Sequence, residues 1–130
     1  MPELVLPRRT EAVAVACEAV EAFAAGIGWA TADVDRVTLA TGEAVGNAVE
    51  HGGAGTREPI RLYYALADGH VELCVRDGGP GPNPDRVASA RLPSDRLSTG
   101  GRGLFLLRRL ADRVGVDSSG GVCLSFAPSR

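Results

Sequence analysis

The sequence predicts an α+β fold, a two-layer sandwich in which helices cover one face of a mixed, mostly antiparallel sheet. Two helical patterns follow one another directly, and two strand patterns joined by a tight turn come next. A third helical pattern precedes a final pair of strands. The helices are therefore grouped and do not alternate one-for-one with strands, as they would in a parallel doubly wound fold.

The N-terminal part of the chain is expected to form a short strand and two helices. Residues 4–6 are an apolar strand candidate, and Thr10 is placed to cap a helix over residues 11–25. Thr31 is expected to cap a second helix, which ends at the glycine pair 52–53. Apolar residues recur in it at helical spacing. The predicted buried stripe consists of Val34, Val37, Ala40, Thr41, Ala44, Val45 and Ala48.

The centre of the chain predicts a hairpin. Residues 60–67 and 71–76 are strand candidates joined by Asp68-Gly69, a dipeptide typical of tight hairpin turns. Asp77 falls where the second strand ends.

The C-terminal part predicts an irregular segment, a helix and two strands. Residues 78–101 are rich in Gly, Pro and Ser, and a long irregular segment in a compact domain is usually functional, so a lid is expected here. A helix follows over residues 103–112, and the last strands are expected at 113–117 and 122–126.

Bulk properties restrict the classes of function. A length of 130 residues fits one domain spanning 1–130. The net charge of −2 argues against non-specific nucleic-acid binding, which needs a basic surface. No apolar run is long enough to span a membrane, and the N-terminus lacks the pattern of a signal peptide. A cytoplasmic protein with no membrane or nucleic-acid partner is expected.

The three cysteines are predicted to be free thiols. Cys17, Cys74 and Cys123 are odd in number, widely separated and surrounded by apolar residues. Such cysteines are typical of buried thiols in a reducing cytosol, and neither a disulfide nor a metal site is expected.

The most informative pair is Glu43 and Asn47, four residues apart in the second predicted helix. Residues at this spacing share a helix face, so a carboxylate that can take up a proton and an amide oxygen that can reach Mg²⁺ would point the same way. The plainer interpretation is a solvated helix face carrying two polar residues.

Two glycine-rich turns follow. Asp77 is followed by Gly79 and Gly81, and because glycine lets backbone approach a ligand closely, this turn suits an adenine pocket or simply a turn. Gly101-Arg102-Gly103 precedes a predicted helix whose first N–H groups can bind an anion. The alternative is a flexible hinge.

The chain contains no lysine. A Walker-type P-loop and the usual protein-kinase fold both place a lysine on the phosphates, so both are excluded for an ATP-binding protein of this sequence. Phosphate charge would have to be met by arginine, backbone N–H groups and a metal ion.

Taken in order, these motifs resemble those of the histidine-kinase-type ATPase domains of the GHKL superfamily. More narrowly, the chain is similar to the small anti-sigma-factor serine/threonine kinases. The similarity comprises an N box over residues 43–51, an Asp-x-Gly-x-Gly box over residues 77–81, and a second glycine box over residues 101–106. It extends over essentially the whole chain and implies the histidine-kinase-like, or Bergerat, fold.

The resemblance implies a role for each matching residue. Asn47 would hold Mg²⁺, Asp77 would accept a hydrogen bond from the adenine amino group, and Glu43 would be the general base for an attacking serine or threonine hydroxyl. The residues that would bind the nucleotide are Asn47, Asp77, Gly79, Gly81, Gly101, Arg102, Gly103 and Leu104. The implied cofactors are ATP and Mg²⁺, and His51 stays outside the catalytic set.

The function that the resemblance implies is that of an anti-sigma regulator with serine/threonine kinase activity. Its expected partners are a sigma factor and the anti-sigma-factor antagonist that it phosphorylates, and homodimerisation is expected from the resemblance alone. A strand beginning near residue 3 leaves no room for the dimerising segment of a sensor histidine kinase, which favours a stand-alone domain. The alternatives are a non-catalytic ATP-binding interaction module and a small α+β protein that binds no nucleotide.

Overall fold

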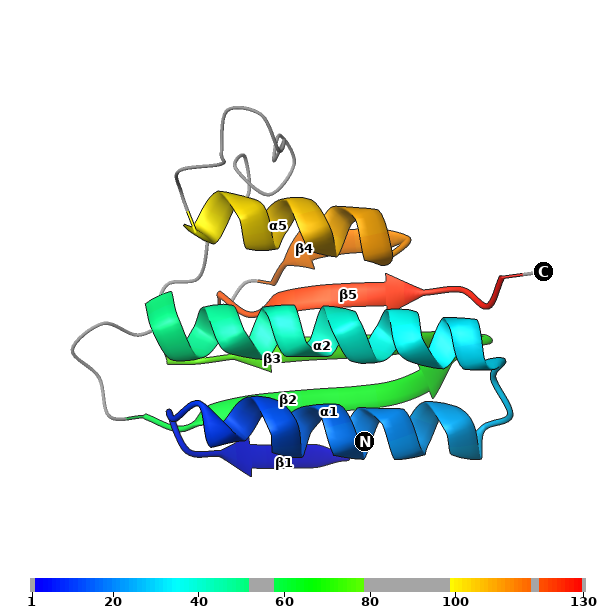
Figure 1. The fold of residues 1–130 in the computed structure, drawn as a ribbon, viewed down its shortest axis with the longest axis horizontal. Coiled ribbons are helices and arrows are strands. Elements are labelled where there is room, and N and C mark those ends of the chain that lie inside the picture. The colour runs from blue at the N-terminus through cyan, green and yellow to red at the C-terminus, as the bar shows by residue number, and fades with distance from the viewer. Residues whose placement is uncertain (1, 52–57, 79–98, 118–119, 130) are drawn as a thin grey trace.

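The computed structural model describes residues 2–51, 58–78, 99–117 and 120–129 (Figure 1). In chain order the elements are β1 (Glu3–Leu6), α1 (Glu11–Gly26), α2 (Thr31–His51), β2 (Ile60–Ala67), β3 (His70–Arg76), α5 (Thr99–Leu110), β4 (Arg113–Val116) and β5 (Val122–Phe126). The helices form one layer and the sheet forms the other, with α2 between α1 and α5 (Figure 1). The predicted α+β two-layer architecture is confirmed.

The sheet has five strands in the order β1-β2-β3-β5-β4, and each described neighbouring pair is antiparallel. A mixed sheet was expected. The antiparallel pairing has a topological reason: α1 and α2 run in opposite directions, so the chain enters β2 at the end where it left β1 (Figure 1). β4 has the same direction as β3, but β5 lies between them.

The predicted hairpin is confirmed. Asp68 and Gly69 link β2 to β3 with φ of 52° and 78°. Two successive residues with positive φ are the hallmark of a type I′ turn, whose twist matches that of the strands it joins. The turn sets the register, in which Leu62 lies opposite Val75 and Tyr64 opposite Leu73.

The core lies between the two layers. All seven residues predicted for the buried stripe of α2 are at most 7% exposed. Opposite them, β3 and β5 direct Leu73, Leu124 and Phe126 into the same core, and α5 contributes Leu107. Each such side chain stabilises the fold by about 1.5–3 kcal/mol relative to leaving it exposed.

α1 starts at Glu11, as predicted, with Thr10 at the N-cap position, but the Thr10 side chain makes no capping hydrogen bond and its hydroxyl bonds the Glu11 carboxylate. The structure corrects the starts of the other two helices. Thr31 is already inside α2, and the carbonyl of Ala30 accepts the first bonds of that helix. The third helix, α5, starts at Thr99, several residues before the expected position 103.

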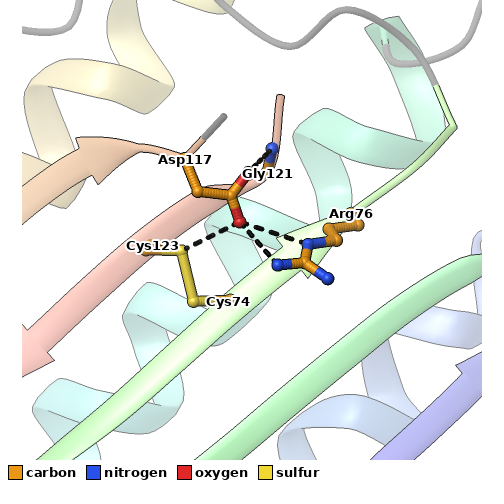
Figure 2. Close-up of a disulfide and its surroundings, with 5 residues drawn as sticks. All are labelled: Cys74, Arg76, Asp117, Gly121 and Cys123. Atoms are coloured by element: carbon orange, nitrogen blue, oxygen red, sulfur yellow. Dashed lines mark hydrogen bonds and ion pairs between the residues drawn. A yellow bond between two sulfur atoms is a disulfide. The ribbon is translucent and has the colours of Figure 1, made fainter. Parts of the chain in front are cut away.

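The prediction of three free thiols is wrong for Cys74 and Cys123, which form a disulfide across β3 and β5 (Figure 2). The two residues are 49 positions apart in the chain, but they are directly opposite each other in the register of the sheet. They lie on the sheet face away from the helices, because their neighbours Leu73 and Leu124 point into the core. Spacing along the chain therefore gave no sign of the bridge.

Cys17 is the free cysteine of the described chain, as predicted. It is partly buried in α1, where its thiol donates to the carbonyl of Thr38 in α2. Burial, and secondarily the charge of Glu21, raises the pKa of this thiol above its usual value, so it remains protonated at neutral pH.

The C-terminal segment is fastened to the start of α2. Asp33, 2% exposed, accepts hydrogen bonds from the backbone N–H and hydroxyl of Ser129. Arg36 donates to the carbonyls of Leu110 and Ala127 and forms an ion pair with Asp112 at 3.2 Å. These contacts lie at the end of α5 remote from its first turn.

Within the described ranges, no helix combines the length and the apolar character required to cross a bilayer.

Candidate functional site

The three motif-bearing segments meet at one end of the molecule. The C-terminal end of α2, the end of β3 and the start of α5 all lie at the left of Figure 1. α2 contacts both β3 and α5. The fold therefore brings together three segments that are separated in the sequence by 20 or more residues.

Glu43 and Asn47 lie one turn apart in the second half of α2, and both side chains are half-buried. They flank the helix face that Ala44 and Ala48 bury in the core. Both polar groups thus lie at the edge of the buried stripe, where a side chain is held by packing on one side and accessible on the other. This position suits a carboxylate or an amide that acts on a ligand.

Gly46, the residue before Asn47, is not required by the packing of the described residues. A Cβ atom built at this position would have no described atom within 4 Å, apart from those of its own helix turn and chain neighbours. Glycine in a helix interior costs about 1 kcal/mol relative to alanine. Packing within the described structure therefore does not require this glycine.

Asp77 directly follows β3 and is half-buried. The next residue, Gly78, has a φ of 81°, a backbone conformation that residues other than glycine rarely adopt. A Cβ at Gly78 would also lie 2.6 Å from Oε2 of Glu58 and 3.0 Å from its Cβ. The backbone therefore turns sharply just after Asp77, and only glycine fits the turn without displacing Glu58.

Gly101 and Arg102 of the second glycine box lie inside the first turn of α5, whereas the sequence predicted a helix that starts only at Gly103. The consequence for anion binding is small, because the first four N–H groups of a helix have no intrahelical partner. Among the described residues, these are the N–H groups of residues 99–101. The helix dipole adds partial positive charge at this end. Within the helix, the backbone N–H of Gly101 thus has no i−4 acceptor, as an anion-binding N–H requires.

Several predicted site residues lie outside the described structure. Gly79 and Gly81 belong to the range 79–98, as does most of the predicted lid. Gly101, Arg102, Gly103 and Leu104 are placed as helix backbone only.

Sequence reasoning missed Arg8, in the loop between β1 and α1. Its guanidinium donates to the carbonyl of Ala48 at 2.9 Å, to that of Glu58 at 3.0 Å and to that of Asp77. No local pattern marks this arginine, since its acceptors are 40 to 69 residues away in the chain.

The site fits a metal ion that arrives with its nucleotide. Among the described residues, no group of three or more His, Cys, Asp or Glu side chains could hold a metal. Mg²⁺ characteristically uses one or two protein oxygens and takes its remaining ligands from phosphates and water. The amide oxygen of the half-buried Asn47 is a ligand of this kind.

Comparison with known proteins decides the family. Residues 6–127 match the histidine kinase-like ATPase domain. The chain belongs to this family. The resemblance to GHKL-type anti-sigma-factor kinases is confirmed, because curated relatives named serine-protein kinase RsbW align over most of the chain.

Two of these relatives illustrate the range of sequence identity. The protein from Halalkalibacterium halodurans is 30% identical over 132 residues, which cover 95% of this chain and 80% of the relative. The protein from Oceanobacillus iheyensis is 26% identical over 132 residues, covering 96% and 84%.

Solved structures agree on the fold. The RsbU and RsbW domains of Rv1364c from Mycobacterium tuberculosis superpose with a TM-score of 0.69 at 25% identity, covering all of this chain. This chain spans 33% of that structure's length. The SiaB–SiaC complex from Pseudomonas aeruginosa gives a TM-score of 0.64 at 12% identity, with 97% of this chain and 88% of the other covered. The second likeness concerns the fold alone.

Proposed function

We propose that this protein is an ATP-dependent serine/threonine kinase that acts as an anti-sigma regulator, built as one ATP-binding domain over residues 1–130. The observation that supports this most directly is the pairing of Glu43 and Asn47 on one half-buried edge of α2. The end of β3, which Asp77 directly follows, and the first turn of α5 lie at the same end of the molecule (Figure 1). The relatives named serine-protein kinase RsbW support the choice of reaction.

Each part of the site has a task in this proposal. Asp77 accepts a hydrogen bond from the adenine amino group, and Asn47 provides an oxygen ligand for the metal. Mg²⁺ with ATP supplies the transferable phosphoryl group and neutralises part of its charge. The remaining nucleotide contacts are assigned to Gly79, Gly81, Gly101, Arg102, Gly103 and Leu104.

Glu43 is the general base. Its carboxylate takes the proton from the serine or threonine hydroxyl that attacks the γ-phosphorus, while the bond from the γ-phosphorus to the β–γ bridging oxygen breaks and ADP leaves. Such a base must lie within hydrogen-bonding reach of the attacking hydroxyl. The half-buried edge of α2 allows this, because a hydroxyl of a second protein can approach Glu43 from the accessible side. Phosphoryl transfer otherwise depends mainly on positioning and charge neutralisation.

The partners in this proposal are a sigma factor, which the protein sequesters, and an antagonist protein, whose serine or threonine receives the phosphate. Homodimerisation belongs to the proposal as well. The non-catalytic ATP-binding module is the alternative that the following experiment separates from the kinase.

The test has two stages. Calorimetric titration with ATP and Mg²⁺ is expected to show metal-dependent binding that Asp77→Asn weakens at least tenfold, because the adenine loses its charged acceptor. Transfer of labelled γ-phosphate to antagonist proteins of the same organism is then measured for wild type and Glu43→Gln.

Glu43→Gln is expected to lower transfer by 10²-fold or more while ATP affinity persists, since general-base catalysis is worth about that much. Glu18→Gln, on the exposed side of α1, is the matched control and should transfer at the wild-type rate. Equal activity of Glu43→Gln would remove Glu43 from the role of base. ATP binding without any transfer would favour the non-catalytic module.

A further inference from the structure

Arg8 joins three backbone segments at the site end of the molecule. Its guanidinium reaches the carbonyls of Ala48 near the end of α2, Glu58 before β2, and Asp77 after β3. Arg8 itself is half-buried between β1 and α1. One side chain therefore connects segments that are 40, 50 and 69 residues away from it in the sequence.

These carbonyls lie at or beyond the ends of regular elements. α2 ends at His51, so Ala48 lies in its last turn. Glu58 and Asp77 lie outside the ladder that pairs β2 with β3. A cation is also favoured at this position by the negative end of the helix dipole.

The position of the acceptors relates Arg8 to the candidate site. Ala48 directly follows Asn47, and the carbonyl of Asp77 belongs to the residue whose carboxylate is assigned to adenine. Glu58 packs against the sharp turn at Gly78. Arg8 thus holds the segment assigned to the metal and phosphates at a fixed distance from the segment assigned to adenine.

We propose that Arg8 is a positioning residue of the nucleotide site, which fixes the spacing between Asn47 and Asp77; this inference rests on the proposed function. A nucleotide contacts both segments at once, so an error in their spacing weakens binding even when each segment is intact. The guanidinium suits this task, because its planar fork presents five N–H donors in fixed directions and never loses its charge. The ammonium group of lysine is a point charge and cannot reproduce that geometry.

The test compares Arg8→Met with a matched variant, Arg36→Met. Both changes keep an unbranched apolar stem and remove a guanidinium that bonds backbone carbonyls. Arg36, however, bonds the carbonyls of Leu110 and Ala127, away from the site end of α5. Affinity for ATP with Mg²⁺ is measured by calorimetry well below each melting temperature, and the melting temperatures are recorded separately.

The positioning role predicts that Arg8→Met lowers affinity tenfold or more, whereas Arg36→Met lowers the melting temperature and leaves affinity within twofold of wild type. Arg8→Lys is expected to recover part of the affinity and to remain at least threefold weaker than wild type. If Arg8→Met does not fold, Arg8→Lys carries the test with that threshold.

Two results would overturn the role of Arg8. One is binding by the folded Arg8 variants within twofold of wild type. The other is an equal loss of affinity in Arg36→Met, which would show that affinity follows general stability. A wild-type protein that binds no ATP would be a different failure, because it would refute the proposed function and with it the site that Arg8 positions.

Discussion

Reducing the Cys74–Cys123 bridge is expected to lower the stability of this protein substantially. The bridge joins β3 to β5 near the middle of the sheet, so it closes a covalent loop through the C-terminal part of the chain. Beside it, Asp117 forms an ion pair with Arg76 at 2.8 Å (Figure 2). Asp117 Oδ2 also lies 3.7 Å from Cys123 Sγ, which is a packing contact when the sulfurs are bonded, since a disulfide has no proton to donate.

The magnitude follows from the length of the closed loop. In the chain-entropy model, a cross-link stabilises the native state by restricting the unfolded chain, and the effect rises with the logarithm of loop length. For the 49-residue separation between the two cysteines, this gives about 4 kcal/mol near room temperature. The free energy of unfolding of a domain of this kind is only about 5–15 kcal/mol. Loss of the bridge would therefore remove a large part of that free energy.

The assay is urea denaturation with and without a thiol reductant, with the bridge verified by mass before and after reduction. We expect the reduced protein to unfold at a clearly lower urea concentration. Cys17→Ser should keep this sensitivity, because Cys17 is not in the bridge. A double variant with serine at positions 74 and 123 should unfold at the same concentration in both conditions.

The reasoning would be refuted by either of two results. Alkylation of the unreduced, denatured protein could reveal three free thiols, which would mean that no bridge forms. Alternatively, a bridge verified by mass could leave the unfolding midpoint unchanged on reduction, which would mean that the loop-closure estimate does not apply. In a compartment that keeps thiols reduced, the protein would have the stability of the reduced form.

Two further predictions concern α2. Gly46→Ala should raise the free energy of unfolding of the nucleotide-free protein by about 1 kcal/mol in urea denaturation, because the new methyl group meets no described atom within 4 Å. The same change should weaken ATP binding if the nucleotide lies against this position. A lower free energy of unfolding would show that the methyl group does not fit there. Acid should weaken the attachment of the C-terminal segment. The hydroxyl of Ser129 lowers the pKa of Asp33, and the backbone N–H of Ala127 lowers that of Asp112, so each contributes stability that is fully present above the ordinary carboxyl pKa of about 4 and is lost as the pH falls through the lower folded-state pKa. The stability difference between wild type and Asp33→Asn should therefore be constant near neutral pH and shrink below about pH 4, and a difference independent of pH would contradict this assignment.

Much of the fold was predictable because it depends on neighbours in the sequence. Helical periodicity identified every buried residue expected in α2, and Asp68-Gly69 identified the hairpin. The pairing of Glu43 with Asn47 on one edge of a helix follows from the same periodicity. The start of α1 was predicted correctly, whereas Thr31 lies inside α2 and α5 begins four residues before the predicted Gly103.

What the sequence by itself determined about this protein is therefore local: the elements, the buried faces and the order of the three motifs that indicate the family. Only the tertiary structure decided which distant residues meet. The register of β3 against β5 brings Cys74 opposite Cys123, and the packing of the β1–α1 loop brings Arg8 to the carbonyls of Ala48 and Asp77. The physical reason is range, because dihedral preferences and periodicity act over a few residues, whereas these contacts form only when separate elements are packed on a common core.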